Sequence, residues 1–101
     1  MIYALVVPGP INDTVDVRVL QWHAQEGIAL KPGDMIVELE TNKSVVEIRA
    51  AQNGVFRRRL CREGAWRRMG NPLAILTDEA NTPLPETADG LPEWQADFQL
   101  T

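Results

Sequence analysis

The chain has 101 residues, of which 45% are hydrophobic and 24% are charged, and its formal net charge is −4 at pH 7. This composition is typical of one globular domain and excludes wholesale disorder. A single Cys and a single His exclude a four-ligand zinc site and an internal disulfide, so we predict no metal site and no catalytic side chains.

The first seven residues are apolar, but they are too few for the hydrophobic region of a signal peptide or for a membrane span. No other window approaches the length of a transmembrane helix. The lone cysteine fits a reducing compartment. We therefore expect a cytoplasmic protein with no membrane partner.

Short runs of alternating apolar and polar residues follow one another along the chain, separated by Gly, Pro and Asn. They predict strands over residues 2–7, 16–22, 35–40, 44–50, 55–62 and 73–77. No window before residue 78 has the periodicity of a helix. We therefore expect an all-β fold in residues 1–78, a small sandwich or barrel.

Residues 79–101 are rich in Pro, Thr, Asp and Glu, which predicts an acidic tail or linker that is flexible. An alternative comes from Leu91, Trp94 and Phe98, whose spacing after Pro92 allows a short amphipathic turn that packs on the domain or on a partner.

Charge is segregated along the sequence, with a net charge of +6 in residues 49–77 and −6 in residues 78–101. We interpret the arginines as a solvated sheet face; docking of the acidic tail and an acidic partner surface are the alternatives. Nucleic acid is not expected as a partner, because the overall charge is negative and few aromatic residues lie among the arginines.

The two halves of the chain are similar when one is shifted by 37 positions. The matches are Glu26-Gly27 with Glu63-Gly64, Gly33 with Gly70, Asp34 with Asn71, Ile36 with Leu73 and Leu39 with Leu76. Matching glycines predict matching turns with positive φ. We interpret this repeat as a flattened sandwich of two antiparallel sheets with pseudo-two-fold symmetry, in which each half supplies one sheet.

Polar residues 40–44 lie between two of the predicted strands, which predicts a β-hairpin with Asn42 and Lys43 near its tip. Lys43 would then point into solvent, at the end of the sandwich opposite the two chain ends. A lysine in a turn is usually only a solubilising charge, so its meaning depends on the surrounding sequence.

That surrounding sequence, residues 19–77, resembles the lipoyl domain of the 2-oxoacid dehydrogenase complexes, a barrel-sandwich hybrid. The residues that carry the resemblance are Trp22, Glu26-Gly27, Lys31-Pro32-Gly33-Asp34, Glu40-Thr41-Asn42-Lys43-Ser44, Glu47-Ile48, Asn53-Gly54-Val55, Glu63-Gly64, and Gly70 with Pro72-Leu73-Ala74. The internal repeat is what the pseudo-symmetry of that family implies.

The resemblance implies that Lys43 carries lipoic acid in amide linkage and that Glu40, Thr41, Asn42 and Ser44 form the recognition surface around it. It implies attachment by a lipoate ligase or a lipoyl/octanoyl transferase. It also implies three working partners: a thiamine-diphosphate decarboxylase, an acyltransferase core and a flavin-dependent dihydrolipoyl dehydrogenase. We assign partner specificity to Glu38, Glu40, Glu47 and the loop 8–14, only because they lie near Lys43 in the expected hairpin.

The sequence departs from the lipoyl family at two places: the family usually has Asp where Asn42 stands, and Ala-Pro where Ala50-Ala51 stand. One alternative is a biotin carrier domain of a carboxylase, in which the lysine usually lies between two Met residues; Asn42 and Ser44 favour lipoyl over biotinyl. Another alternative is an unmodified protein-binding module of the same fold, which only the charge segregation favours.

Overall fold

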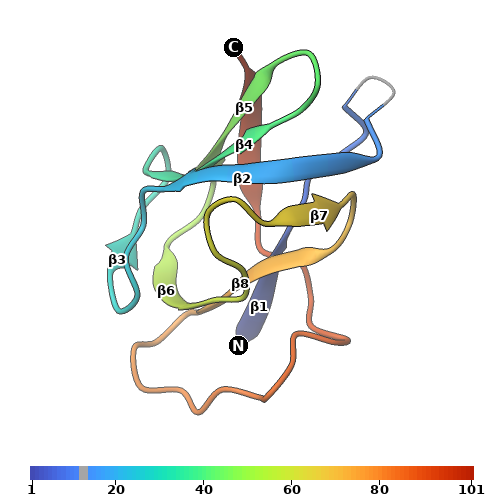
Figure 1. The fold of residues 1–101 in the computed structure, drawn as a ribbon. Helices are drawn as coiled ribbons and strands as arrows, with labels where there is room; N and C mark the ends of the chain where they lie inside the picture. Colours follow the sequence, from blue (N-terminus) through green and yellow to red (C-terminus); the bar gives the residue numbers. More distant parts are fainter. Residues whose placement is uncertain (12–13) are drawn as a thin grey trace.

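Two antiparallel sheets make up the part of the chain that the computed structural model describes, residues 1–11 and 14–101 (Figure 1). The four-stranded sheet has the order β1 (Ile2–Val6), β8 (Pro72–Thr77), β6 (Gly54–Arg59), β3 (Ala29–Leu30). The five-stranded sheet has the order β7 (Trp66–Arg68), β2 (Asp16–Trp22), β4 (Met35–Glu40), β5 (Val45–Ala50), β9 (Ala96–Leu100). Within these residues there is no helix with the length and hydrophobicity that a membrane span requires. The predicted all-β sandwich is confirmed.

The core lies between the two sheets, and in strands such as β2 and β5 it is built from alternate residues. On β2, for example, Val17 and Val19 are fully buried while Arg18 between them is exposed. Trp22 meets Phe56 of the opposite sheet edge to face, with ring centroids 5.6 Å apart. The period-two pattern in the sequence therefore marks the residues that face the core, and it locates β2 and β4 with their observed bounds.

The internal repeat appears in the structure as paired hydrogen bonds. The Gly27 N–H donates to Phe56 O at 2.7 Å, and the equivalent Gly64 N–H donates to Val19 O at 2.7 Å. Both glycines have positive φ, at 93° and 90°. The predicted pseudo-two-fold symmetry is therefore confirmed in the backbone.

The assignment of one sheet to each half of the chain is wrong. The four-stranded sheet combines β1 and β3 of the first half with β6 and β8 of the second, and the other sheet combines β2, β4 and β5 of the first half with β7 and β9 of the second. The pseudo-two-fold symmetry relates β1, β8, β6 and β3, in that order, to β5, β4, β2 and β7. Each sheet is therefore the symmetry equivalent of the other, and each contains strands from both halves of the chain. A repeat in the sequence indicates equivalent strands and turns, but it does not say which strands pair.

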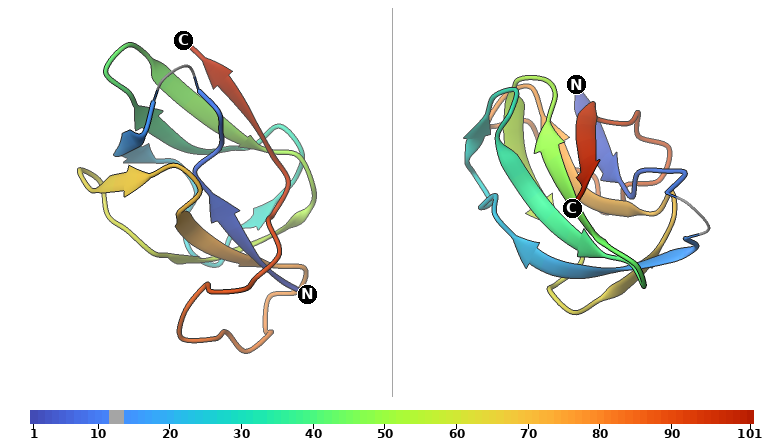
Figure 2. Two further views of the ribbon diagram at one scale, coloured as in Figure 1. Left: turned by 90° about the vertical axis from the view of Figure 1, so that its right-hand side faces the viewer. Right: turned by 90° about the horizontal axis from the view of Figure 1, so that it is seen from above.

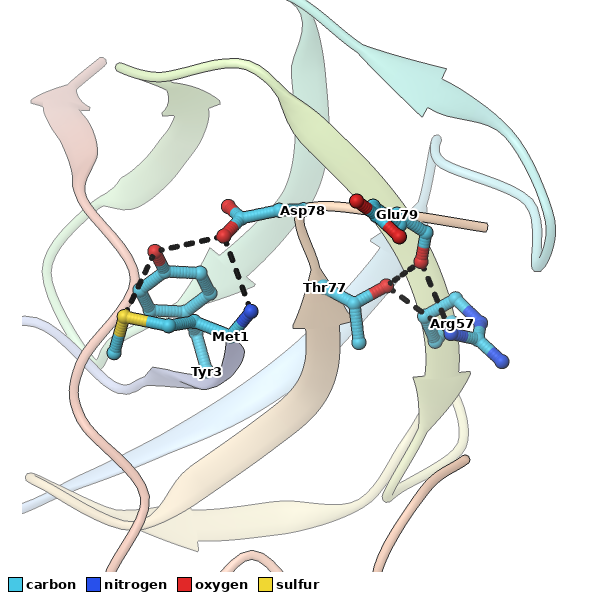
Figure 3. Close-up of polar contacts among 6 residues, drawn as sticks. All are labelled: Met1, Tyr3, Arg57, Thr77, Asp78 and Glu79. Atoms are coloured by element: carbon cyan, nitrogen blue, oxygen red, sulfur yellow. Dashed lines mark hydrogen bonds and ion pairs between the residues drawn. The ribbon is translucent and has the colours of Figure 1, made fainter. Parts of the chain in front are cut away.

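The same symmetry relates the β4–β5 hairpin to the junction between the start of β1 and the end of β8. The Thr41 N–H donates to Ser44 O at 2.9 Å in the hairpin, and the Asp78 N–H donates to Met1 O at 3.2 Å at the junction. There the Met1 amino group also pairs with the Asp78 carboxylate at 3.2 Å, while Thr77 and Arg57 bind the Glu79 carbonyl nearby (Figure 3). In the β4–β5 hairpin the chain itself joins the two strands, whereas at the equivalent β1–β8 junction only non-covalent contacts hold the strands together.

Residues 79–101 differ from the expected flexible tail, because they pack against the sandwich. Leu84, Ala88 and Leu91 cover Ala4 and Ile75 on the outer surface of the four-stranded sheet. Burial of this apolar surface provides the physical reason for docking. The signal in the sequence is the continuous apolar run of β8, which is buried on both faces and so needs a cover on its outer side.

The second part of this segment covers one edge of each sheet, at β1 and at β5. The Ala4 N–H donates to Pro92 O and the Trp94 N–H to Ala4 O, both at 2.9 Å. Trp94 then enters the core at 4% exposure. From Ala96 to Leu100 the chain forms β9, antiparallel to β5 (Figure 2). We call residues 79–101 the strap. The alternative, a short amphipathic turn that packs on the domain, is right that Trp94 packs there. It is wrong about the secondary structure, because residues 96–100 form a strand.

Candidate functional site

The candidate site is the tip of the β4–β5 hairpin, where Lys43 lies as the sequence predicts. The ladder between the strands ends at the pair Glu40 and Val45, and the Thr41 N–H closes the turn on Ser44 O. Because both strands are packed in the five-stranded sheet, the four residues of the turn have a rigid base.

The Thr41 hydroxyl sets the conformation of the turn. It accepts the N–H groups of Lys43 at 3.1 Å and Ser44 at 3.0 Å, and it donates to Ser44 O at 3.1 Å. Thr41 is 7% exposed, so this hydroxyl is largely withdrawn from water. A side chain that binds its own turn in this way fixes the backbone at Lys43. The family resemblance placed Thr41 in a recognition surface; its observed contacts are with the turn itself.

The side chains at the tip are exposed. Asn42 and Lys43 both face solvent, and the Lys43 amino group has neither an ion pair nor a hydrogen bond with any residue that the structure describes. An exposed lysine with an unengaged amine on a rigid turn is sterically open to an enzyme that would modify it. Lys43 on its turn is therefore suited to carry a group attached covalently to its amine.

The acidic residues expected to guide partners lie on one face of the sheet below the hairpin. Glu38 and Glu47 are direct cross-strand neighbours, and Glu40 is two residues further along β4. Each carboxylate has a cationic or ionisable neighbour, Arg18 at 3.8 Å from Glu40, His23 at 2.6 Å from Glu38 and Arg49 at 3.3 Å from Glu47. This face is therefore a mosaic of both charges. Of the loop 8–14, Asn12 and Asp13 lie outside the described residues.

The end of the strap lies beside the hairpin, which the sequence reasoning missed. The Thr101 N–H donates to Val45 O at 2.8 Å and its hydroxyl donates to the same oxygen at 3.2 Å. Figure 1 shows the C terminus and the hairpin at one end of the molecule and the N terminus at the other. The expectation that both chain ends lie opposite the hairpin is therefore wrong for the C terminus. No pattern in residues 96–100 predicts this position of the C terminus, because the extended conformation of β9 is set by its pairing with β5.

The other chemically interesting side chains do not form a second site near Lys43. Cys61 is buried, and this burial raises the pKa of its thiol, while the nearby Arg67 guanidinium opposes the shift. Across residues 1–11 and 14–101, no group of three or more His, Cys, Asp or Glu side chains is arranged to hold a metal ion.

Comparison with known proteins gives one family. A family model described as "Biotin-requiring enzyme", which covers biotin- and lipoyl-bearing domains, matches residues 4–76. The matched range contains both symmetric halves and the hairpin, and it ends one residue before the end of β8. The strap lies outside it.

Three curated relatives show the same segment inside longer proteins. The mouse pyruvate dehydrogenase protein X component is 32% identical over 61% of this chain and 13% of its own length. Two dihydrolipoyllysine-residue succinyltransferase components of 2-oxoglutarate dehydrogenase complexes are also similar. The one from Rickettsia bellii is 24% identical over 83% of this chain and 23% of its own length. The one from Haemophilus influenzae is 36% identical over 55% of this chain and 14% of its own length. The chain thus spans less than a quarter of these relatives.

Proposed function

This chain belongs to the biotin/lipoyl attachment family, and from that premise we propose that it is a lipoyl carrier domain whose Lys43 holds lipoic acid in amide linkage. The observation that carries the proposal is the exposed, unengaged amine of Lys43 on a turn whose backbone Thr41 fixes. We propose residues 1–78 as the carrier unit, with the strap packed on its side.

In the proposed attachment step, a ligase or transferase docks on the hairpin and supplies an activated lipoyl carbonyl. The Lys43 Nζ loses a proton to that enzyme and attacks the carbonyl, the activating group leaves, and an amide bond forms. In this proposal the docking enzyme provides the base that accepts this proton. Asn42 and Ser44, which flank the lysine, are the residues we propose it reads together with Glu40.

When attached, lipoic acid supplies a dithiolane that accepts and releases acyl groups and electrons. The contribution of this chain is mechanical. The sheet fixes the base of the turn, the exposed Lys43 stem rotates freely, and each transfer becomes nearly intramolecular because the arm stays tethered. In this proposal the chain itself contributes no catalytic group.

The partners we propose follow the relatives, which are components of 2-oxoacid dehydrogenase complexes by name. They are the ligase or transferase that modifies Lys43, a thiamine-diphosphate decarboxylase, an acyltransferase core and a flavin-dependent dihydrolipoyl dehydrogenase. Biotin is the alternative cofactor that the family allows. Lipoic acid is favoured because Lys43 lies between Asn42 and Ser44, and because the two succinyltransferase components among these relatives are named for a dihydrolipoyllysine residue.

The test is the intact mass of the protein after incubation with lipoate ligase, lipoate and ATP. We expect a gain of about 188 Da that disappears in Lys43→Arg. The chain offers a matched control, because Lys31 is its only other lysine and Lys31→Arg should keep the full gain.

Two results would redirect the proposal. A gain of about 226 Da with biotin ligase, and none with lipoate ligase, would make the chain a biotin carrier. No gain with either enzyme would leave an unmodified binding module of the same fold.

A further inference from the structure

The arginines of residues 57–68 are the largest concentration of charge that the proposed function leaves unexplained. Arg68 pairs with Asp16 at 3.6 Å, but no ion pair involves the other five within residues 1–11 and 14–101. Arg57 and Arg58 donate to the backbone carbonyls of the strap, at Glu79 and Pro85. The acidic side chains of the strap therefore do not neutralise this cluster, although they belong to the adjacent segment.

The remaining three arginines surround one hollow of about 900 Å³ between the end of β2 and the turn that joins β6 to β7. It is lined by Trp22, Arg59, Leu60, Cys61, Arg62, Glu63, Ala65 and Arg67. The one carboxylate in this lining, that of Glu63, already accepts a hydrogen bond from the backbone N–H of Trp22 at 2.8 Å. The floor is thus partly apolar and the rim strongly cationic, a combination that suits side chains bearing carboxylates on short apolar stems.

Arg59 is held in place before any ligand arrives. Its guanidinium donates to Ala24 O at 2.9 Å and lies over the Trp22 ring, 5.5 Å from the centroid. The ring is fixed in turn, because its Nε1–H donates to Cys61 O at 3.0 Å. An arginine has five N–H donors, so most of them stay available. A group that is already ordered loses little entropy on binding.

The hollow lies at the other end of β2 from the lysine hairpin. Arg18 is the cross-strand partner of Glu40, next to the turn, whereas Trp22 is the partner of Val37, about 13 Å further along the strand. A ligand in the hollow would therefore leave Lys43 free.

We propose that the hollow ringed by Arg59, Arg62 and Arg67 is a docking site for an acidic polypeptide segment of another protein. Carboxylates match the forked geometry of guanidinium groups, and the apolar floor accommodates side chains rather than a bare ion. A nucleic acid is disfavoured because its charged backbone would extend beyond the hollow over a molecule that carries −4 overall, whereas a short acidic segment stays within the hollow. The proposal stands on the hollow and does not depend on modification of Lys43.

The experiment measures binding of a fluorescently labelled hexaglutamate peptide by anisotropy at low ionic strength. We expect the double variant Arg62→Gln/Arg67→Gln to weaken binding by about tenfold, through loss of two charge-assisted contacts. The single variants Arg62→Gln and Arg67→Gln should each weaken binding by about threefold, and their control of equal charge change is Arg68→Gln, which removes one charge from the same segment outside the hollow and should change binding less than about twofold. Thermal unfolding and lipoylation of Lys43 should be unchanged in all variants, which separates this test from the test of the carrier function.

Four results would overturn the proposal. They are no binding of the peptide, an equal loss of binding in Arg68→Gln, tighter binding of a single-stranded oligonucleotide of equal charge, and salt-sensitive self-association of the unlabelled protein in sedimentation. The last would assign the hollow to the acidic strap of a second copy.

Discussion

At the scale of single residues, Lys43 depends on a neighbour whose role is easy to overlook. The sequence identifies the lysine because a polar segment between two strand patterns predicts a hairpin tip. It does not identify Thr41 as the residue that fixes the tip, because Thr, Ser and Asn are all compatible with a turn. Only the contacts distinguish them, since a single hydroxyl oxygen accepts two N–H groups of the turn.

We expect Thr41→Val to lower the free energy of unfolding by about 1–2 kcal/mol, because it removes three hydrogen bonds from a buried position. It should also slow lipoylation, since the backbone at Lys43 loses its anchor. Urea denaturation and a time course of mass gain measure the two effects. Thr41→Ser keeps the oxygen and should stay close to the native protein in both; equal losses in both variants would contradict the role of the hydroxyl.

A second residue-scale prediction concerns Cys61. Its pKa is raised by burial above the ordinary value of 9.0, so the unfolded chain releases the thiol proton before the folded chain does. The contribution of this group to stability is therefore complete below about pH 9 and declines as the pH rises through the folded pKa. Urea denaturation at pH 8 and pH 10 should show a smaller decline in Cys61→Ala than in the native protein. Equal declines would mean that the thiol is not protected.

At the scale of elements, the structure depends on one side chain of the strap. Trp94 fills the opening between the sheets and lies over Gly54, where an added Cβ would be 3.2 Å from its Nε1. The sequence predicts a strand only from residue 55 onward, which leaves Gly54 outside it. The structure places it at the start of β6 without positive φ, and an added Cβ would also be 3.1 Å from Thr77 O, so glycine here lets both the indole and the backbone of β8 approach closely.

Trp94→Ala should lower the free energy of unfolding by about 3–5 kcal/mol and release β9 from β5. Trp66 provides the matched control, because it is 62% exposed and its replacement by Ala should change stability by less than about 0.5 kcal/mol. Denaturation measures the first effect, and hydrogen exchange at the amides of residues 96–100 measures the second. Slow exchange of those amides in Trp94→Ala would show that β9 docks without the anchor.

The strands themselves divide into those that the sequence predicts and those that it does not. β5 alternates strictly between buried and more exposed residues, and β2 and β4 do so except at one irregularity in each, because one face of these strands is buried and the other faces solvent. β3 and β7 are two and three residues long, too short for any periodicity to be visible. β9 has one apolar anchor upstream and a mostly exposed surface, so its extended form is imposed by pairing with β5 rather than by its own pattern.

At the scale of the whole molecule, the internal symmetry makes a quantitative prediction. Gly27 and Gly64 have nearly equal positive φ and nothing within 4 Å of an added Cβ, so replacement by Ala introduces backbone strain alone. Each single variant should lose about 1–2 kcal/mol of stability. The two losses should agree within about 0.5 kcal/mol and add in the double variant, because the glycines occupy equivalent turns without a shared partner. Denaturant titration of the three variants is the measurement, and clearly unequal losses would show that the equivalence is only geometric.

The junction between Met1 and Asp78 has a kinetic consequence. The hairpin corner joins strands that are neighbours along the chain, so its contacts form at small entropic cost. The equivalent corner must bring Ile2 to Thr77 across most of the sequence before their ladder can form. Long loop closure of this kind slows folding. We therefore expect the sandwich to fold first around the β4–β5 hairpin, and the ladder between β1 and β8 to form last.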